Sequence, residues 1–307
     1  AGMRGKKGAE YEGGHRVPFL IRFPDKNGLK PASYDDLTTY TDILPTLTDL
    51  VGGKLAAEYP LDGTSLMPLL KTGKQEELED RIVVVDTQRK DLPVKGKNSC
   101  VMQGHWRLIN GKELYNLKAD PSQLKDVMAG NEGYASTLQD AYEAWWNSME
   151  EDFKVTHRMI VGREMKKTDL LTSHDWHSEK DPPWNQGQIR AGKVDNGWWA
   201  LDVAEAGQYA IKLFRYPPEL GLPFGASVPP GDDVPGGKAY AAGEPIIPVT
   251  AKMKVGEQEF EDKLTAADLS VDFTAYLDAG PIDLQTWVLD EAGVERGAYY
   301  VVVERFE

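Results

Sequence analysis

Two lysines beside glycines near the start of the chain have the residue types of an anion-binding loop. The loop runs through Arg4-Gly5-Lys6-Lys7-Gly8 and is followed by a Glu-Gly-Gly turn at residues 12–14. Glycine lets the backbone approach an anion closely, and the lysine ammonium groups supply positive charge. We therefore predict an anion site at this loop. The alternative is that Lys6 and Lys7 are solvated surface charges.

The order Lys-Gly-x-x-Tyr-Glu-Gly-Gly-x-Arg-Val-Pro, which begins at Lys7, resembles a motif that type I sulfatases carry late in their catalytic domain. These are arylsulfatase-like enzymes of the alkaline phosphatase superfamily. Two further stretches, at residues 42–47 and 61–66, resemble the same family in the same order. The resemblance implies that the protein is a hydrolase of sulfuric esters and that Lys7 contacts the sulfate of its substrate.

The resemblance also implies that most of the reaction chemistry lies before this sequence. The family's nucleophile is a cysteine in Cys-x-Pro-x-Arg that is oxidised to formylglycine, and its acidic Ca²⁺ ligands precede the lysine motif. Cys100 is the one cysteine here, and its surroundings, Asn98-Ser99-Cys100-Val101-Met102, lack that Pro and Arg. We therefore expect Ca²⁺ and formylglycine in a missing N-terminal half of the same protein, assign no metal ligand here, and expect the 307 residues alone to be inactive.

Three polar residues around the Glu-Gly-Gly turn have roles that the sequence leaves open. Glu12 and Arg16 flank the turn, and we expect them to pair with each other or with backbone groups and so to hold the loop. His15 lies directly after the two glycines. It could contact a substrate, or it could hydrogen-bond within the loop and act only in its structure.

A second informative stretch combines aromatic rings with imidazole, acid and amide groups. It contains His174, Trp176, His177 and Trp184, with the pair Trp198-Trp199 after it. Aromatic rings stack on the C–H faces of sugars while polar groups bond the hydroxyls, so we predict substrate binding by the first four. The alternatives are that the tryptophans belong to a core or a domain interface, or that the two histidines bind a metal, for which a third ligand is not apparent.

Three functional hypotheses follow, two enzymes of one superfamily and one binding module. The leading prediction is the C-terminal portion of a sulfatase that acts on a sulfated small molecule or glycan. The second is a non-catalytic module that binds carbohydrate through the tryptophan-rich stretch. The third is a phosphoesterase of the same superfamily, which the motif at Lys7 disfavours.

The first half of the chain has the pattern of an α/β domain that ends in a small antiparallel sheet and a helix. Phe19-Leu20-Ile21 is continuously apolar between Pro18 and Pro24, which predicts a strand buried on both faces. A helix is predicted over 41–53, with an apolar face in the core. Short strands are expected at 82–85, 100–102, 106–109 and 114–117, with a hairpin at Asn110-Gly111, and an amphipathic helix over 134–149.

The second half has the pattern of an all-β sandwich. Residues 206–215, 251–255 and 298–304 alternate apolar and polar side chains, and connections rich in Pro and Gly separate them. We therefore predict two domains, the end of a sulfatase catalytic domain at 1–153 and an accessory β-sandwich at 154–307.

Charge and composition limit the partners. The 35 Lys and Arg against 49 Asp and Glu give a formal net charge of -14 at pH 7. That balance argues against broad affinity for nucleic acid or anionic membranes, so an anionic substrate would need a local cationic pocket. We also expect no membrane span, since no apolar run is long enough. A periplasmic or secreted location is implied by the family alone.

Overall fold

The computed structural model describes residues 2–23, 29–54, 61–88 and 90–306 and divides the chain into two compact units. The first unit contains residues 1–88 and 93–152, and the second contains 89–92 and 153–307. The boundary predicted from the sequence lies between residues 153 and 154, one residue after the division between the two units. No helix among the described residues is long and apolar enough to cross a membrane.

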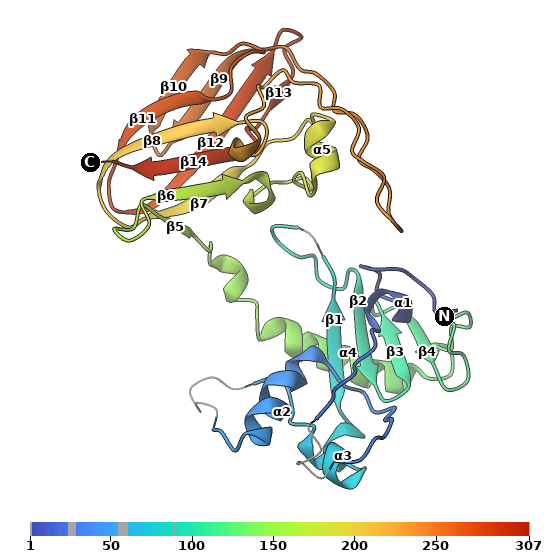
Figure 1. Cartoon of the computed structure of the whole chain (residues 1–307). Coiled ribbons are helices and arrows are strands. Elements are labelled where there is room, and N and C mark those ends of the chain that lie inside the picture. Colours follow the sequence, from blue (N-terminus) through green and yellow to red (C-terminus); the bar gives the residue numbers. More distant parts are fainter. Residues whose placement is uncertain (1, 24–28, 55–60, 89, 307) are drawn as a thin grey trace. The chain divides into compact units, whose positions relative to one another are not determined.

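The first unit is built on a small antiparallel sheet in the order β1-β2-β3-β4 (Figure 1). Its strands are β1 (Ile82–Asp86), β2 (Ser99–Gln103), β3 (Trp106–Ile109) and β4 (Glu113–Asn116). Its helices are α1 (Glu12–His15), α2 (Ile43–Leu50), α3 (Met67–Thr72) and α4 (Glu132–Asn147). Asn110 and Gly111, with φ of 51° and 65°, join β3 to β4 by the predicted tight hairpin.

Both faces of this sheet are covered. α4 packs against β1, β2 and β3 and buries Leu138, Tyr142 and Trp146. The helix predicted over 134–149 is therefore confirmed, and its buried tryptophan is Trp146. A cluster of Cys100, Met102, Ile109 and Tyr115 packs against Tyr11 and Leu37, which attaches the N-terminal loop to the sheet.

Two apolar segments of the first unit do not lie in its core. Residues 16–23 form no strand, and Leu20 is 91% exposed, so the predicted central strand is wrong within this chain. The reason is that a strand needs hydrogen-bonded neighbours, and none of the described residues supplies them. The core face predicted for the helix at 41–53 is wrong as well, because α2 exposes Ile43, Leu44 and Leu47 and buries Pro45 and Thr46.

The second unit is a β-sandwich, as predicted. Its larger sheet has the order β10-β9-β12-β7-β5, with β13 paired to β12, and its smaller sheet has the order β11-β8-β14-β6. The larger sheet contains β5 (Met159–Val161), β7 (Trp198–Val203), β9 (Pro248–Val255), β10 (Gln258–Lys263), β12 (Gly280–Asp290) and β13 (Glu295–Arg296). The smaller sheet contains β6 (Thr168–Thr172), β8 (Gly207–Phe214), β11 (Val271–Leu277) and β14 (Tyr300–Arg305), and the short helix α5 (Gln186–Arg190) lies outside both.

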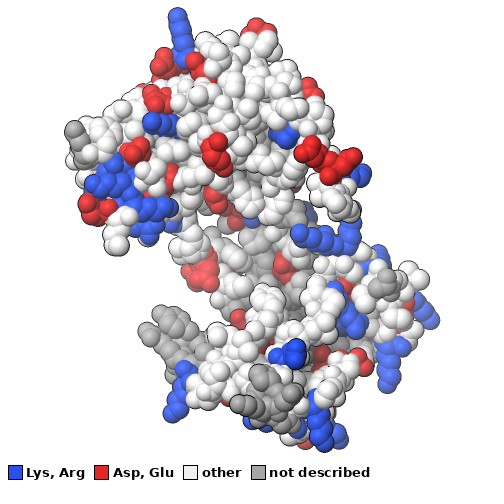
Figure 2. All heavy atoms as spheres, in the orientation of Figure 1, with Lys and Arg blue, Asp and Glu red and all other residues white. Residues whose placement is uncertain are grey.

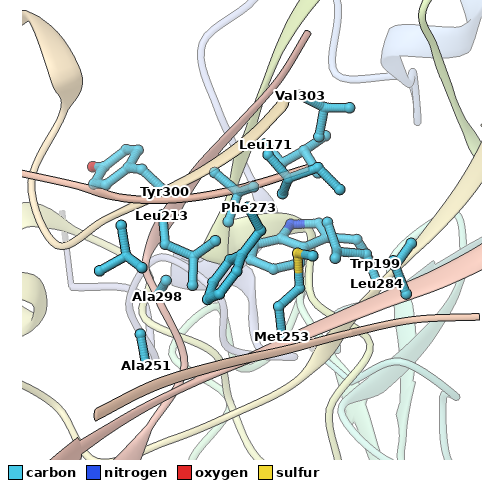
Figure 3. Packing of buried hydrophobic residues seen from close by; sticks show 14 of the residues in the cluster. Leu171, Trp199, Leu213, Ala251, Met253, Phe273, Leu284, Ala298, Tyr300 and Val303 are labelled. Carbon is cyan, nitrogen blue, oxygen red and sulfur yellow. The ribbon is translucent and has the colours of Figure 1, made fainter. Parts of the chain in front are cut away.

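The sandwich core lies between the two sheets (Figure 3). Side chains from the larger sheet, such as Trp199, Met253 and Leu284, meet Leu213 and Phe273 from the smaller one. Burial alternates strictly along β8 and β11, as strands with one face in a core require. The outward-facing positions of these strands are therefore free to carry polar side chains.

Candidate functional site

Lys7 lies at the tip of a tight turn. The backbone N–H of Ala9 donates to the carbonyl oxygen of Lys6 at 2.8 Å, which closes a β-turn over residues 6–9. Gly8 occupies the third position with φ of 85°, the conformation that a type II turn requires there. Lys7 is exposed, and no ion pair links it to another described residue. The turn therefore holds an uncommitted ammonium group on a defined backbone.

The two glycines of the Glu-Gly-Gly turn are required by close backbone packing. The N–H of Gly13 donates to the carbonyl oxygen of Arg4 at 2.8 Å. A Cβ atom on Gly13 would lie 2.7 Å from that oxygen, and one on Gly14 would lie 1.9 Å from the carbonyl oxygen of Ala9. Helix α1 thus rests directly on the chain that carries Lys7, so the two segments cannot move independently.

Glu12 anchors this assembly to the sheet. Its side chain is 2% exposed, and its Oε1 accepts a 2.6 Å hydrogen bond from Nε of Arg107 on β3. Its backbone N–H donates to Oε1 of Gln123 at 2.8 Å. Burial alone would raise the pKa of Glu12, but His15 and Arg107 outweigh it and bring the pKa to about 2. Glu12 is therefore an ionised, buried anchor.

The flanking residues His15 and Arg16 complete this anchor. Nη1 of Arg16 lies 3.5 Å from Oε2 of Glu12, which is the pairing that the sequence suggested. Nε2 of His15 lies 3.4 Å from Oε1 of Glu12, and neither ring nitrogen has a well-formed hydrogen bond among the described residues. The ring of His15 is only 12% exposed. Its nearest charged neighbour is thus the structural carboxylate, which favours the structural role.

Arg4 forms a second attachment between loop and sheet. Its guanidinium donates to the hydroxyls of Tyr11 and Tyr115, each at 2.9 Å, and lies 3.8 Å from the ring centroid of Tyr11. Both hydroxyls donate to Oε2 of Glu113. Burial and the nearby Glu113 carboxylate raise the pKa of Tyr11 to about 12. Arg4 is thus held in the loop's framework and is not available to an external anion.

Arg107, Gln123 and Glu113 were missed by the sequence analysis. They lie about a hundred residues after the loop, and Arg107 is surrounded by apolar strand residues. The one available signal was a charged residue inside the otherwise apolar strand at 106–109, because such a residue needs a buried partner.

The aromatic residues predicted to bind substrate in the second unit separate into three groups. Trp176 is buried in the sandwich core, where its ring lies 5.7 Å from that of Trp199, which matches the alternative of a core role. Trp184 is 49% exposed, and its ring lies 4.1 Å from that of His174. His177 stacks on Trp198 at 4.4 Å. Of the predicted set, His174 and Trp184 are the exposed, adjacent pair whose rings a ligand on the surface could contact.

The described residues contain neither a cluster of metal ligands nor an accessible thiol. No group of three or more His, Cys, Asp or Glu side chains in the described part of the chain could hold a metal ion. Cys100 is fully buried on β2, and burial raises the pKa of its thiol to about 12. Its thiol is therefore neither accessible nor ionised at neutral pH.

The first unit is similar in sequence to the C-terminal part of sulfatases. The family described as N-sulphoglucosamine sulphohydrolase, C-terminal, matches residues 6–149. Mouse steryl-sulfatase is 41% identical over 74 residues, which are 24% of this chain and 12% of that protein. Choline-sulfatase of Rhizobium meliloti is 28% identical over 128 residues, 40% of this chain and 23% of that protein. An ulvan-active sulfatase of Formosa agariphila is 39% identical over 80 residues, 26% and 15% of the two chains.

The chain therefore matches less than a quarter of the length of each of these relatives. Among solved structures, a family 35 carbohydrate-binding module from Cellvibrio japonicus has 11% identity and a TM-score of 0.24, over 46% of this chain and 98% of that one. The corresponding module from Clostridium thermocellum has 9% identity and a TM-score of 0.25, over 44% and 98%. Scores this low establish neither a shared fold nor a shared function.

Proposed function

Since residues 6–149 belong to the C-terminal domain family of type I sulfatases, we propose that this chain contributes Lys7 as a sulfate contact to an enzyme that hydrolyses sulfate esters. The observation that carries the proposal is the fixed turn at residues 6–9. It presents the Lys7 ammonium group to solvent while the neighbouring cation, Arg4, is held in the framework. A positioned cation with no internal partner among the described residues is suited to an external anion.

The chemical role of Lys7 would be electrostatic. Lys7 would lie against the non-bridging oxygens of the sulfate while the S–O bond of the ester breaks and negative charge develops on the single leaving oxygen. A cation already in place stabilises that charge without reorganising at the moment of reaction. The buried pair of Glu12 and Arg107 would serve this role indirectly, because it fixes the backbone on which Lys7 lies.

The remaining catalytic groups are proposed to belong to a preceding part of the same protein. The described residues offer no cluster of metal ligands, and Cys100 is buried outside any Cys-x-Pro-x-Arg sequence. We assign Ca²⁺ and formylglycine to that preceding part and derive no step through them here. The exposed apolar side chains of Val17, Leu20, Leu44 and Leu47 support such a partner, since each would be buried by a packed neighbour.

A sulfated carbohydrate is the substrate class that we favour, with a periplasmic or secreted location. Its support is the half-exposed ring of Trp184 beside His174, which could stack on a sugar. The relatives do not share one substrate class by name, since they include a steryl-sulfatase and a choline-sulfatase beside an ulvan-active one.

The test compares Lys7→Ala with Lys6→Ala in the enzyme encoded by the complete gene. Both lysines lie in one turn and are exposed, so Lys6 is a matched control. We expect Lys7→Ala to lower kcat for release of sulfate from a sulfated sugar by about 10²–10³-fold, as for loss of one oxyanion-stabilising donor. Lys6→Ala should remain within a few-fold of the parent. Equal activities of the two variants would exclude the assigned role.

A second candidate function is carbohydrate binding by the second unit without catalysis. The exposed ring of Trp184 favours it. Affinity electrophoresis of the 307-residue chain in gels that contain sulfated glycans would show retardation, and Trp184→Ala would abolish it. Leu220→Ala, at a similarly exposed apolar position, is the control. Retention of binding by Trp184→Ala would remove this residue from the candidate site.

A further inference from the structure

The larger sheet of the second unit has an outer face whose side chains are not those of the core. On β9, Ala251 and Met253 are buried, and Figure 3 shows them among the core residues together with Leu284 of β12. Successive side chains on a strand point to opposite faces. Lys252 and Lys254 of β9, with Gln285 and Trp287 of β12, therefore stand on the outer face.

The strand register brings these outer residues together. Trp287 pairs with Lys252, which pairs in turn with Glu261 of β10. In the next outward-facing row, Gln285 lies between Lys254 and Trp198 of β7. The two tryptophans are thus diagonal neighbours on one face of the sheet, a separation that large aromatic side chains can bridge.

A hollow lies over this part of the sheet. It has a volume of about 390 Å³, and Trp287 lines it together with Lys252, Lys254, Glu259, Glu261 and Glu295. We call these six residues and Gln285 the Trp287 face. None of them was singled out from the sequence, and they are distinct from the pair of Trp184 and His174.

The charges on the Trp287 face are interleaved and nearly cancel. Nζ of Lys252 lies 3.3 Å from Oε2 of Glu261, and Nζ of Lys254 lies 3.6 Å from Oε1 of Glu259. Glu295 adds a third carboxylate to the two lysines. A sulfated or phosphorylated ligand would thus meet an excess of negative charge. Figure 2 shows the same intermingling of acidic and basic side chains on the visible face of the second unit.

Sugar hydroxyls match this arrangement better than an ion does. A hydroxyl both donates and accepts, so it can donate to a carboxylate and accept from an ammonium or amide group. The ring of Trp287 offers an apolar surface for the C–H face of a pyranose. Most ligand sites combine an apolar surface with a few polar groups in this way.

We propose that the Trp287 face binds an uncharged stretch of a glycan chain. This function goes beyond sulfate-ester hydrolysis and does not depend on Lys7. It would hold the protein on an unsulfated segment of a polymer, whereas the turn at Lys7 is suited to the anion itself.

The test uses the 307-residue chain with neutral mannan, xylan and galactan, each beside a chemically sulfated preparation of the same polymer. Affinity electrophoresis and titration calorimetry measure binding. We expect at least one neutral polymer to bind, more tightly than its sulfated counterpart. Trp287→Ala should weaken that binding at least tenfold, while Trp184→Ala leaves it unchanged. Binding to none of the three neutral polymers, or stronger binding to each sulfated form, would overturn the proposal.

Further variants separate loss of binding from loss of structure. Lys252→Gln combined with Glu261→Gln removes one ion pair without changing the net charge. We expect this double variant to bind more weakly, while its midpoint of unfolding remains that of the parent. Trp287→Tyr keeps a stacking ring and should retain part of the affinity. If both variants bind like the parent, the face is not the site. Lys7→Ala should keep full glycan binding whether or not it affects sulfate release, so failure of one proposal is visible apart from failure of the other.

Discussion

The loop that carries Lys7 and the Trp287 face both combine cations with carboxylates, but their ion pairs have different roles. In the first unit the ion pair of Glu12 and Arg107 is buried, and Lys7, the proposed sulfate contact, is exposed and not part of it. In the second unit the pairs of Lys252 with Glu261 and Lys254 with Glu259 are exposed. A buried pair can fix a backbone, because breaking it leaves a charge without solvent. An exposed pair fixes little and mainly cancels charge where a ligand would bind.

Among the variants that test this comparison, Arg107→Met should cause the largest loss of stability. It leaves the Glu12 carboxylate buried without its 2.6 Å partner, and removing one member of a buried pair typically costs about 3–5 kcal/mol. Hydrogen exchange of the β2 and β3 amides in urea would measure the unfolding of the first unit. Exchange from the second unit should not change. A loss below about 1 kcal/mol would mean that the pair does not anchor the loop.

Gly14→Ala should cause the next largest loss of stability. Its new Cβ would overlap the carbonyl oxygen of Ala9 at 1.9 Å, so the loop must separate from α1, at roughly 3–4 kcal/mol. The matched control is Gly133→Ala within α4, where a Cβ meets nothing within 4 Å. That variant should gain about 0.5–1 kcal/mol, because alanine favours a helix. Thermal unfolding of the two proteins should therefore move in opposite directions.

The pH dependence of stability should show whether the ionised Glu12 carboxylate stabilises the first unit. Its pKa is about 2 in the folded chain and about 4.5 in the absence of these contacts. Because the folded pKa is the lower one, the stabilisation is fully present above pH 4.5 and is lost as the pH falls towards 2. The difference corresponds to about 3 kcal/mol. Urea unfolding at several pH values would measure the free energy of unfolding. Between pH 4.5 and 2 it should fall less steeply with decreasing pH for Glu12→Gln than for the parent.

Lys252→Gln should have the smallest effect on stability. Its ion pair with Glu261 is exposed, and such pairs contribute about 0–1 kcal/mol. Urea unfolding followed by exchange of the β9 and β12 amides would measure it, and a cost close to that of Arg107→Met would contradict the distinction between the two regions.

The sequence predicted local structure well where neighbours in the chain determine it. The Asn110-Gly111 hairpin and the alternating strands of the sandwich depend on backbone preference and side-chain period, which are local. The strand predicted at 19–21 failed because its partners are not among the described residues. The contact of Glu12 with Arg107 spans 95 residues, and no spacing rule connects them. Trp287 could have been found, since β12 alternates buried and outward residues and places a tryptophan at an outward position.

Because Cys100 is buried, labelling of its thiol reports the opening of the first unit. The chain has a single thiol, it lies on β2, and at neutral pH it is protonated as well as enclosed. A thiol-alkylating reagent can modify it only while that sheet is open, so the labelling rate records the population of the open state whenever reclosing is faster than alkylation. The β-sandwich carries no cysteine and is silent in this assay. Alkylation followed by mass spectrometry would therefore follow the opening of the first unit within the intact chain, with no mutation introduced.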